Sequence, residues 1–408
     1  MSRDLTLPWG AWSPDGHEER RFEFPENWTV ELLEMSGWPP GALPDLAGLR
    51  AAIWEEAKGK STVSVAIEDL TRPTPLAPVL ETVLGGLMEA GVPDSRIDLV
   101  MALGAHGPPD ARGIRRKVGD WVADRFTVRL HDPTGRLADT GMQVGAIPLR
   151  IDAGFWEADL RVGLGSMIPN PFAGFSGGAK IVLPGLASLD VLVWLHSLAM
   201  MGFGGGVASV KGNRVRAEIE RVGAALPLHF SVACLVDSGR RLREVFYGRP
   251  GQSYAKAHAR ARTVYTTPMS DRFDILLCSA YPKDGEFLQA ENAYSPLRTG
   301  GMHFLAPEGS VVLMAACHGG RGRHGLFDTG MPLHRPAVRP KGFLHGADVS
   351  VYAPGISEAD CRVTHWEGYC HFREWGDLMR ALLERHGEGA RAGVFPAGAL
   401  QLGPERSA

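Results

Sequence analysis

Hydrophobic and polar residues alternate along the chain in blocks that predict strands and helices in turn. The β-branched run at residues 62–67 predicts a strand. Apolar residues then recur at helical spacing from Leu76 to Met88, and Gly91 closes this predicted helix. Residues 97–103 predict the next strand. The order of strand, helix and strand is typical of a parallel α/β sheet.

Later parts of the chain repeat this order. Four more segments have the apolar character of strands: 158–167, 273–280, 310–316 and 348–354. A helix is predicted at residues 188–201. We therefore expect an α/β fold of two domains, in which mainly parallel sheets are flanked by helices. The boundary is expected near residue 268, which divides the chain into residues 1–267 and 268–408.

Composition narrows the class of protein. The net charge of −3 gives no basic surface, so we expect neither a nucleic-acid partner nor an anionic membrane surface. The five cysteines form no C-x-x-C pair, which argues against a zinc knuckle or a disulfide framework and favours a reducing cytoplasm. The N-terminal residues lack the apolar core of a signal peptide. The apolar run at 191–207 is short and contains His196, so we interpret it as a buried helix and loop.

A glycine-rich turn at residues 170–185, NPFAGFSGGAKIVLPG, is the first candidate for chemistry. Gly177 and Gly178 permit backbone conformations that are closed to other residues, and their amides can line up around an anion, with Ser176 adding a hydroxyl. Lys180 can then supply a counter-charge, or a nucleophilic amine if burial lowers its pKa. The spacing is not that of a P-loop. A tight surface loop with a solvated lysine explains the glycines equally well.

Two polar loops follow predicted strands, at the end of a parallel sheet where ligands bind. The first loop contains Asp69, Thr71 and Arg72, and its guanidinium can grip a carboxylate or phosphate, or form a structural ion pair. The second loop holds His106 between glycines, which suits a general base but also a histidine that faces water. His196 lies on an apolar helical face, where a packed core histidine and a metal ligand are both possible.

A third loop, at residues 317–325, is glycine-rich and positive, with His318, Arg321, Arg323 and His324. It can close over an anion, although a solvated loop is the interpretation that we favour.

Together these segments resemble the lactate racemase family, whose members carry a nickel-pincer nucleotide. The family pattern runs through five blocks that keep their order here: 69-DLTRP-73, 104-GAH-106, 173-AGFSGGAK-180, 183-LPG-185 and then His196, sixteen residues after the lysine. Three shorter matches accompany them: 212-GN-213, 281-YPKD-284 and the Gln289-Ala290 pair. The resemblance extends from about residue 65 to about residue 325, and the AGFSGGxK block is its most specific part.

The resemblance implies a two-domain α/β protein with its active site in the interdomain cleft, in which residues 1–267 bind the cofactor and carry the catalytic groups. It implies a mononucleotide that holds nickel through sulfur, carbon and sulfur, and that is joined covalently to Lys180. His196 then completes the nickel coordination. The remaining cofactor-binding positions that it implies are Asp69, Thr71, Arg72, Ser176, Gly177, Gly178 and Gln289.

The implied reaction is racemisation or epimerisation of a 2-hydroxy acid by reversible hydride transfer, with His106 as the base and Arg72 as the anion clamp. Enzymes that mature the cofactor are implied as partners. Four residues depart from the family pattern: Asn170 replaces the second catalytic histidine, Leu288 a tyrosine, Asn292 a lysine and Gly107 a common arginine. An amide cannot accept a proton at neutral pH, so Asn170 enters the candidate site as a hydrogen-bonding group. We therefore expect a substrate other than lactate.

Several alternatives stay open at this point. Another residue can replace the missing base, and the candidates are His303, His318, Lys283 and His324. A different 2-hydroxy acid or polyol acid can instead be epimerised through one histidine and water. The protein can instead be a cofactor-binding homologue without catalysis, which Asn170 favours, or a different hydride-mediated redox isomerase. A metal-free enzyme that uses Lys180 as a Schiff-base nucleophile is a further alternative.

Overall fold

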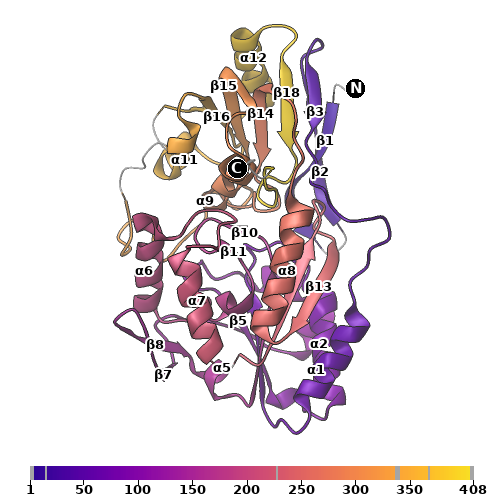
Figure 1. The fold of residues 1–408 in the computed structure, drawn as a ribbon, viewed down its shortest axis with the longest axis vertical. Coiled ribbons are helices and arrows are strands. Elements are labelled where there is room, and N and C mark those ends of the chain that lie inside the picture. Colours follow the sequence, from indigo (N-terminus) through magenta and orange to yellow (C-terminus); the bar gives the residue numbers. More distant parts are fainter. Residues whose placement is uncertain (1–3, 14–15, 227, 336–340, 366–367, 405–408) are drawn as a thin grey trace. The chain divides into compact units, whose positions relative to one another are not determined.

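A computed structural model describes residues 4–13, 16–226, 228–335, 341–365 and 368–404. These residues belong to two compact units (Figure 1). Unit 1 comprises Met1–Gly37, Arg262–Arg323 and His334–Ala408, and unit 2 comprises Trp38–Ala261 and His324–Leu333. The units differ from the expected division at residue 268, because the first 37 residues belong with the C-terminal part of the chain.

Unit 2 is built on a six-stranded sheet. Its strands, in spatial order, are β13 (Leu242–Gly248), β12 (Phe230–Val236), β9 (Leu160–Ser166), β4 (Val63–Glu68), β5 (Ile97–Ala102) and β6 (Val128–Leu130). Only the pairing of β12 with β13 is antiparallel within this sheet of described residues, and the other pairs are parallel. The strands predicted at 62–67, 97–103 and 158–167 are therefore confirmed, as is the parallel α/β class.

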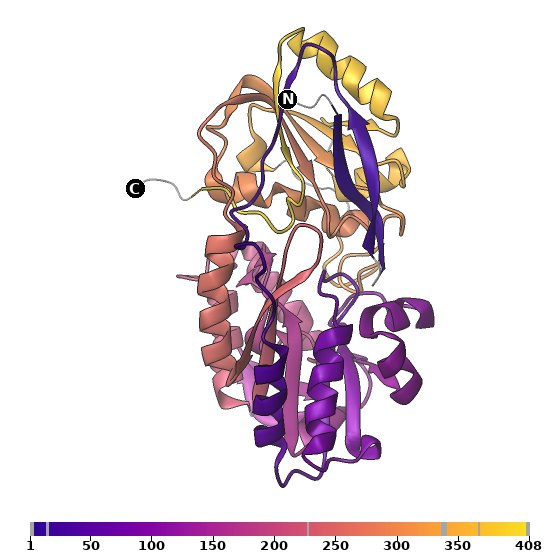
Figure 2. The ribbon, with the colours of Figure 1, turned by 90° about the vertical axis from the view of Figure 1, so that its right-hand side faces the viewer.

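Helices cover both faces of this sheet, which explains why all six residues of β4 are buried. The helices of unit 2 are α1 (Leu46–Ala57), α2 (Ala77–Glu89), α3 (Ala111–Val118), α4 (Asp120–Arg125), α5 (Ala153–Glu157), α6 (Leu189–Leu198), α7 (Arg214–Ala225) and α8 (Pro250–Tyr265), the last of which ends in unit 1. On one face Val65 packs with apolar residues of α1 and α2, which stand side by side in Figure 2. On the other face Ala66 packs with apolar residues of α6 and α7.

Short elements complete unit 2. They are the hairpin of β7 (Leu137–Val144) with β8 (Ile147–Asp152), the short pair β10 (Pro169–Asn170) with β11 (Gly174–Phe175), and the helical turns η1 (Asp94–Arg96), η2 (Gly178–Ile181) and η3 (Ala199–Phe203). The predicted helix at 188–201 is confirmed as α6 and η3. Among the described residues, the structure contains no helix with the length and apolarity that a membrane crossing requires.

Unit 1 has its own six-stranded sheet, and all its pairs are parallel. In spatial order the strands are β17 (Cys370–Phe372), β16 (Asp348–Tyr352), β15 (Leu305–Met314), β14 (Phe273–Ser279), β18 (Arg391–Phe395) and β3 (Thr29–Leu32). The predicted strands at 273–280, 310–316 and 348–354 are confirmed as β14, β15 and β16. Strand β3 joins the N-terminal residues to this unit, because Thr29 pairs with Arg391.

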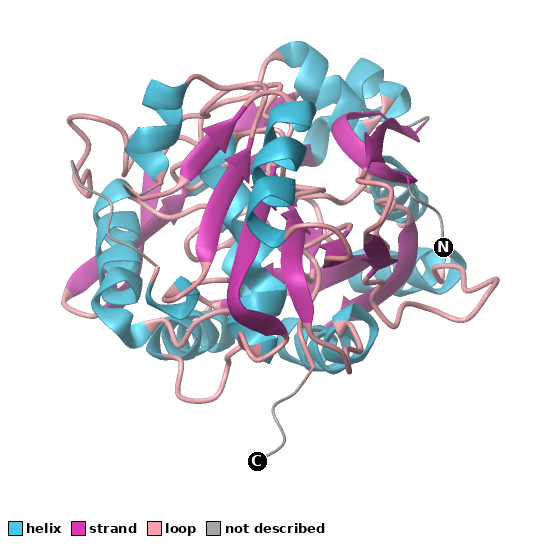
Figure 3. Ribbon diagram, turned by 90° about the horizontal axis from the view of Figure 1, so that it is seen from above, coloured by secondary structure: helices cyan, strands magenta, loops and turns pink. Residues whose placement is uncertain are grey.

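Helices and a hairpin surround the sheet of unit 1. The helices are α9 (Phe287–Ala290), α10 (Ser295–Gly300), α11 (Glu358–Thr364) and α12 (Trp375–His386), with the 3-10 turns η4 (Glu291–Tyr294) and η5 (Gly342–Leu344). Strands β1 (Asp4–Ser13) and β2 (Gly16–Glu23) form an antiparallel hairpin, whose Leu7, Trp9 and Phe22 enter the core beside Leu277 of β14. Figure 3 shows the strands in magenta and the helices in cyan.

Candidate active site

Polar residues gather in unit 2 where three neighbouring strands end. Asp69 follows β4 directly, and His106 lies four residues after β5. The turn that carries Lys180 follows β9, which pairs with β4. Because parallel strands end at the same edge of a sheet, these three segments meet there, as the sequence pattern predicts.

The first pair in this site is formed by His106 and Asp69. Nδ1 of His106 lies 2.6 Å from Oδ2 of Asp69, and both side chains are largely buried. Oδ1 of Asp69 accepts hydrogen bonds from the backbone N–H of Thr71, at 2.7 Å, and from its hydroxyl, at 2.5 Å. The hydroxyl oxygen of Thr71 in turn accepts a hydrogen bond from Arg72, at 2.9 Å. One carboxylate therefore orders both the histidine and the loop.

The charge state of Asp69 decides what His106 can do. Burial acts to raise the pKa of Asp69, but the attraction of His106 and of Arg72 outweighs it and holds this pKa well below its usual range. An ionised Asp69 can only accept at His106 Nδ1, so in the neutral form of the ring Nδ1 carries the proton and Nε2 keeps a lone pair. His106 is thus arranged as a base that a carboxylate orients, as in other histidine–aspartate pairs.

A buried ion pair fixes the loop that carries Arg72. Nζ of Lys117 on α3 lies 2.9 Å from Oε1 of Glu68 and also donates to the carbonyl oxygen of Arg72, at 2.9 Å. Oε2 of Glu68 accepts a hydrogen bond from the backbone N–H of Ser166, at 2.6 Å. Strands β4 and β9 and the Arg72 loop are thereby joined through charges that are nearly inaccessible to water. The sequence pattern gave no indication of Lys117, because a single lysine on a short basic helix looks solvated.

The glycine-rich turn holds Lys180 on the short helix η2, which begins at Gly178 and is preceded by Gly177. These glycines have φ values of 84° and 60°, in the left-handed region. A Cβ atom at Gly178 would lie only 3.0 Å from the ring of Tyr254, so the turn lies directly against this ring. The nearby Ser176 hydroxyl is buried and has no hydrogen-bond partner among the described residues. An unpaired buried hydroxyl beside backbone amides suits an anionic group such as phosphate.

The Lys180 amine has a strongly lowered pKa. Burial, and then the repulsion of the Arg72 and Arg216 guanidinium groups, lower its pKa to about 7. No described residue forms a hydrogen bond or an ion pair with this amine. This partly buried position differs from that of a solvated surface lysine, and an amine with a lowered pKa can act as a nucleophile.

The side chain of Asn170 forms hydrogen bonds with the backbone of its own turn. Its Oδ1 accepts hydrogen bonds from the backbone N–H groups of Phe172, at 3.0 Å, and Ala173, at 2.8 Å. The same turn is held from outside by Arg216, which donates to the carbonyl oxygens of Ala173 and Phe175. The oxygen of Asn170 is therefore used inside the turn, and only its NH₂ group is left to meet a ligand.

His196 lies on α6, and its Nδ1 lies 2.8 Å from the carbonyl oxygen of Leu192. A carbonyl oxygen can only accept, so Nδ1 carries the proton and Nε2 keeps its lone pair. Burial lowers the pKa of His196 to about 4, which keeps the ring neutral and suited to metal coordination. The centroid of its ring lies 5.7 Å from that of Phe172 and 6.0 Å from that of Phe327.

The structure divides the positive loop at 317–325 between the two units. His318, Arg321 and Arg323 belong to unit 1, whereas His324 belongs to unit 2. There the ring of His324 lies 5.3 Å from that of His106 and 6.0 Å from that of His196. His303, Lys283 and Gln289, the last on α9, belong to unit 1.

No group of three or more histidine, cysteine or acidic side chains is placed to hold a metal ion in the part of the chain that the structure describes.

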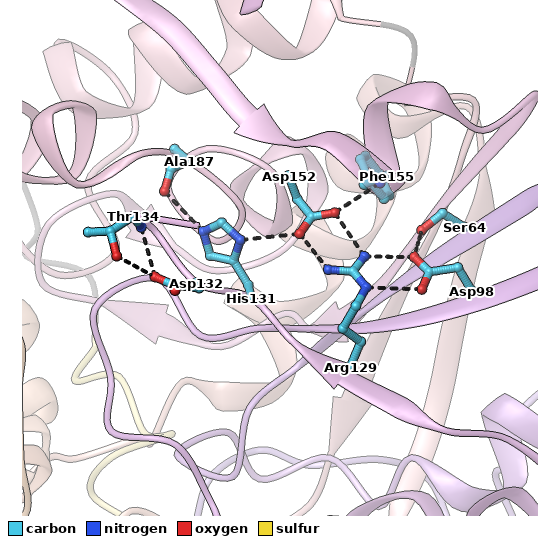
Figure 4. A network of polar contacts seen from close by, with 9 residues as sticks. All are labelled: Ser64, Asp98, Arg129, His131, Asp132, Thr134, Asp152, Phe155 and Ala187. Atoms are coloured by element: carbon cyan, nitrogen blue, oxygen red, sulfur yellow. Dashed lines mark hydrogen bonds and ion pairs between the residues drawn. The ribbon is translucent and has the colours of Figure 1, made fainter. Parts of the chain in front are cut away.

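A second polar network supports the end of the lysine turn (Figure 4). His131 lies between the carbonyl oxygen of Ala187, 3.1 Å from its Nε2, and Asp152, 3.6 Å from its Nδ1. Arg129 bridges Asp152, at 2.6 Å, and Asp98, at 2.8 Å. The network connects β5, β6 and the start of α5 to the segment after Lys180, and its groups are occupied with one another. We therefore interpret it as structural.

The chain is similar to known proteins over much of its length. Residues 16–210 match the lactate racemase N-terminal domain. A lactate racemase of Thermoanaerobacterium thermosaccharolyticum is 25% identical over 280 residues, which are 66% of this chain and 63% of that protein. A lactate racemase of Lactiplantibacillus plantarum is 26% identical over 291 residues, which are 68% of this chain and 66% of that protein. The chain thus spans slightly less than two thirds of either curated relative.

Solved structures show the same fold. The lactate racemase apoprotein of Thermoanaerobacterium thermosaccharolyticum superposes with a TM-score of 0.74 at 18% identity, over 98% of this chain and 100% of that chain. A protein of Thermotoga maritima superposes with a TM-score of 0.67 at 16% identity, over 90% of this chain and 100% of that chain. At these identities the superpositions establish the fold alone.

Proposed function

Since the chain is a divergent member of the lactate racemase family, we propose that it is a racemase or epimerase of a 2-hydroxy acid that works with a covalently held nickel-pincer nucleotide. One observation carries the proposal. A single site combines the unpaired amine of Lys180, whose pKa is near 7, with a neutral His196 and with the His106–Asp69 pair. These are a tether, a metal ligand and a base.

The residues of the site fit such a cofactor. The Lys180 amine would form the covalent link, and Nε2 of His196 would complete the coordination of nickel. The unpaired hydroxyl of Ser176 and the amides of Gly177 and Gly178 would hold the phosphate. When bound, this group supplies a reversible acceptor for the hydrogen on the carbon that bears the substrate hydroxyl. Enzymes that build the cofactor would be needed as partners.

The protein's own groups handle the proton and the carboxylate. Nε2 of His106 takes the proton from the substrate hydroxyl, and the ionised Asp69 stabilises the imidazolium that forms. A placed base of this kind contributes about 10²–10⁴-fold to the rate. The guanidinium of Arg72, which Thr71 holds in place, binds the carboxylate of the hydroxy acid. Because Gly107, Leu288 and Asn292 replace larger or charged residues, we propose that the substrate is not lactate.

A second candidate function rests on Asn170. Its oxygen accepts two backbone hydrogen bonds, and its amide cannot take a proton. The site therefore lacks the second base of the family pattern and keeps His106 as its one base. This arrangement favours a homologue that binds the cofactor without racemising a hydroxy acid. The two functions share the cofactor and differ only in turnover.

Optical purity separates the two candidates. The protein would be co-expressed with the cofactor maturation enzymes and incubated with single enantiomers of 2-hydroxy acids, lactate included, and the products would be resolved by chiral chromatography. We expect one or more hydroxy acids other than lactate to lose optical purity, and His106→Ala to abolish this loss. His345→Ala, at an exposed histidine of unit 1, is the matched control and should keep the parent rate. Nickel-loaded protein that leaves every hydroxy acid optically pure would overturn the enzyme proposal in favour of the second candidate.

A further inference from the structure

Building on the proposed function, we infer that His324 is a hydrogen-bond donor to the oxygen on C2 of the substrate, and that it is not the missing second base. His324 is a candidate replacement for that base because it is a histidine in the site. The geometry around its ring assigns it the opposite role, in three steps.

The first step is its position. The chain enters unit 2 at His324, whose backbone forms an antiparallel bridge with that of His106. The next residue, Gly325, donates its backbone N–H to the carbonyl oxygen of Ala105, at 2.7 Å. Leu326 then packs in a small apolar cluster with Leu192 of α6. Two backbone contacts and an apolar anchor therefore place His324 beside the base, with only 7% of its surface exposed.

The second step is its tautomer. The backbone N–H of Leu326 donates to Nδ1 of His324, at 3.2 Å. A neutral imidazole whose Nδ1 accepts must carry its proton on Nε2. The reverse tautomer would place two hydrogens against each other and leave a buried N–H unpaired, which costs about 1–3 kcal/mol. The same hydrogen bond excludes the doubly protonated ring, in which both nitrogens would be donors.

The three histidine rings of the site differ in which nitrogen donates. His106 and His196 each use Nδ1 as the donor, to Asp69 and to the Leu192 carbonyl oxygen, and each keeps a lone pair on Nε2. His324 alone is turned the other way and offers an N–H at Nε2, for which no described residue supplies an acceptor. The site therefore presents two acceptors and one donor.

The chemistry follows from this arrangement. His106 removes the proton from the C2 hydroxyl, and negative charge then develops on that oxygen. A fixed N–H from the neighbouring ring, 5.3 Å away between centroids, stabilises this charge and holds the oxygen in place while the carbon becomes planar. Proton and oxygen are thus handled by two different histidines. The consequence is a one-base enzyme in which His324 fixes the orientation of the substrate.

Nitrogen-15 NMR of the apoprotein tests the tautomer without cofactor or substrate. The spectrum of the parent, assigned with a His324→Gln variant, should show the Nε2–H form for His324 and the Nδ1–H form for His196. An Nδ1–H signal for His324 would overturn the proposal whatever the cofactor status of the protein. The tautomer is read on the parent chain, and the spectrum of the variant serves only to identify the His324 signals.

Kinetics test the role. With a hydroxy acid that the loaded parent racemises, His324→Phe should lower kcat/KM by about 10²–10³, as expected for loss of one donor to a developing oxyanion. His324→Gln keeps an N–H donor and should recover at least tenfold of that loss. Nickel content and the mass of the Lys180 peptide should stay at the parent level in both variants, which separates this proposal from the cofactor proposal. A Phe variant with the parent kcat/KM, or a Gln variant no better than Phe, would overturn it.

Discussion

The Lys180 amine in the apoprotein should react with an acylating reagent along a pH profile whose midpoint is about 7. Burial is the main cause of the lowered pKa, and the Arg72 and Arg216 guanidinium groups add repulsion. The experiment varies the pH and follows the reactivity of the Lys180 amine. A neutral amine is the nucleophilic form, so reactivity should rise through pH 7 and level off above pH 8.

The size of the effect follows from the two pKa values. An amine with a pKa of about 7 is half neutral at pH 7, whereas a lysine at the reference value of 10.5 has roughly one neutral molecule in 3,000. The site therefore holds about 10³ times more nucleophile at neutral pH than an ordinary lysine. This difference is what would let one lysine among those of the chain be selected for a covalent link.

Trace labelling measures this directly. The apoprotein is exposed to a small amount of acetic anhydride at each pH between 5 and 10, and peptide mass spectrometry gives the rate at Lys180 relative to the exposed Lys256. Arg72→Met is the informative variant. Loss of one repelling cation should raise the midpoint, while burial, the larger cause, should keep it well below 10.5. A midpoint near 10, with rates that follow those of Lys256, would refute the claim that the turn builds a nucleophile.

Three further predictions concern how the site is held, and each is read from urea unfolding. Gly178→Ala should destabilise by about 2–4 kcal/mol, because its new Cβ meets a ring at 3.0 Å, whereas Gly59→Ala, with a similar φ and open space, should lose only about 1–2 kcal/mol. Asn170→Ala should lose about 1–3 kcal/mol with its two accepted hydrogen bonds, while Asn170→Asp, which keeps the acceptor, should lose less; equal losses would contradict the turn role. Lys117→Met should lower the free energy of unfolding by about 3–5 kcal/mol, because it leaves Glu68 buried and unpaired, and adding Glu68→Gln should recover part of this loss. A Lys117→Met variant with the stability of the parent would show that the pair is solvated.

Much of the architecture could be predicted from local patterns. Strand β4 could be predicted because a short apolar run indicates a strand that is buried on both faces. Helix α2 could be predicted because its apolar residues recur at helical spacing. Strand β3 was not, since Thr29–Leu32 is only four residues long and its partner begins at Arg391, at the far end of the chain. Pairing over such a distance has no local sign in one sequence, so the N-terminal residues were assigned to the other domain.

The site shows the same limit. Loop residues such as Asp69 and His106 could be predicted because they follow strands of one parallel sheet. His324 belongs to another unit than the rest of its positive loop. This division depends on contacts with residues far along the chain, which the sequence alone does not reveal. The direction of each imidazole depends on a single backbone partner, such as Leu192 or Leu326, that only coordinates reveal.

The central claim is that Lys180 and His196 together hold a nickel-bearing nucleotide. Intact mass and metal analysis of the protein after co-expression with maturation enzymes test it most directly, with His196→Ala beside the parent. We predict an adduct of nucleotide size on the Lys180 peptide with about one nickel per chain, and in the variant the adduct with greatly reduced nickel. An unmodified Lys180 and no bound nickel in the parent, under conditions that load a known lactate racemase, would contradict it.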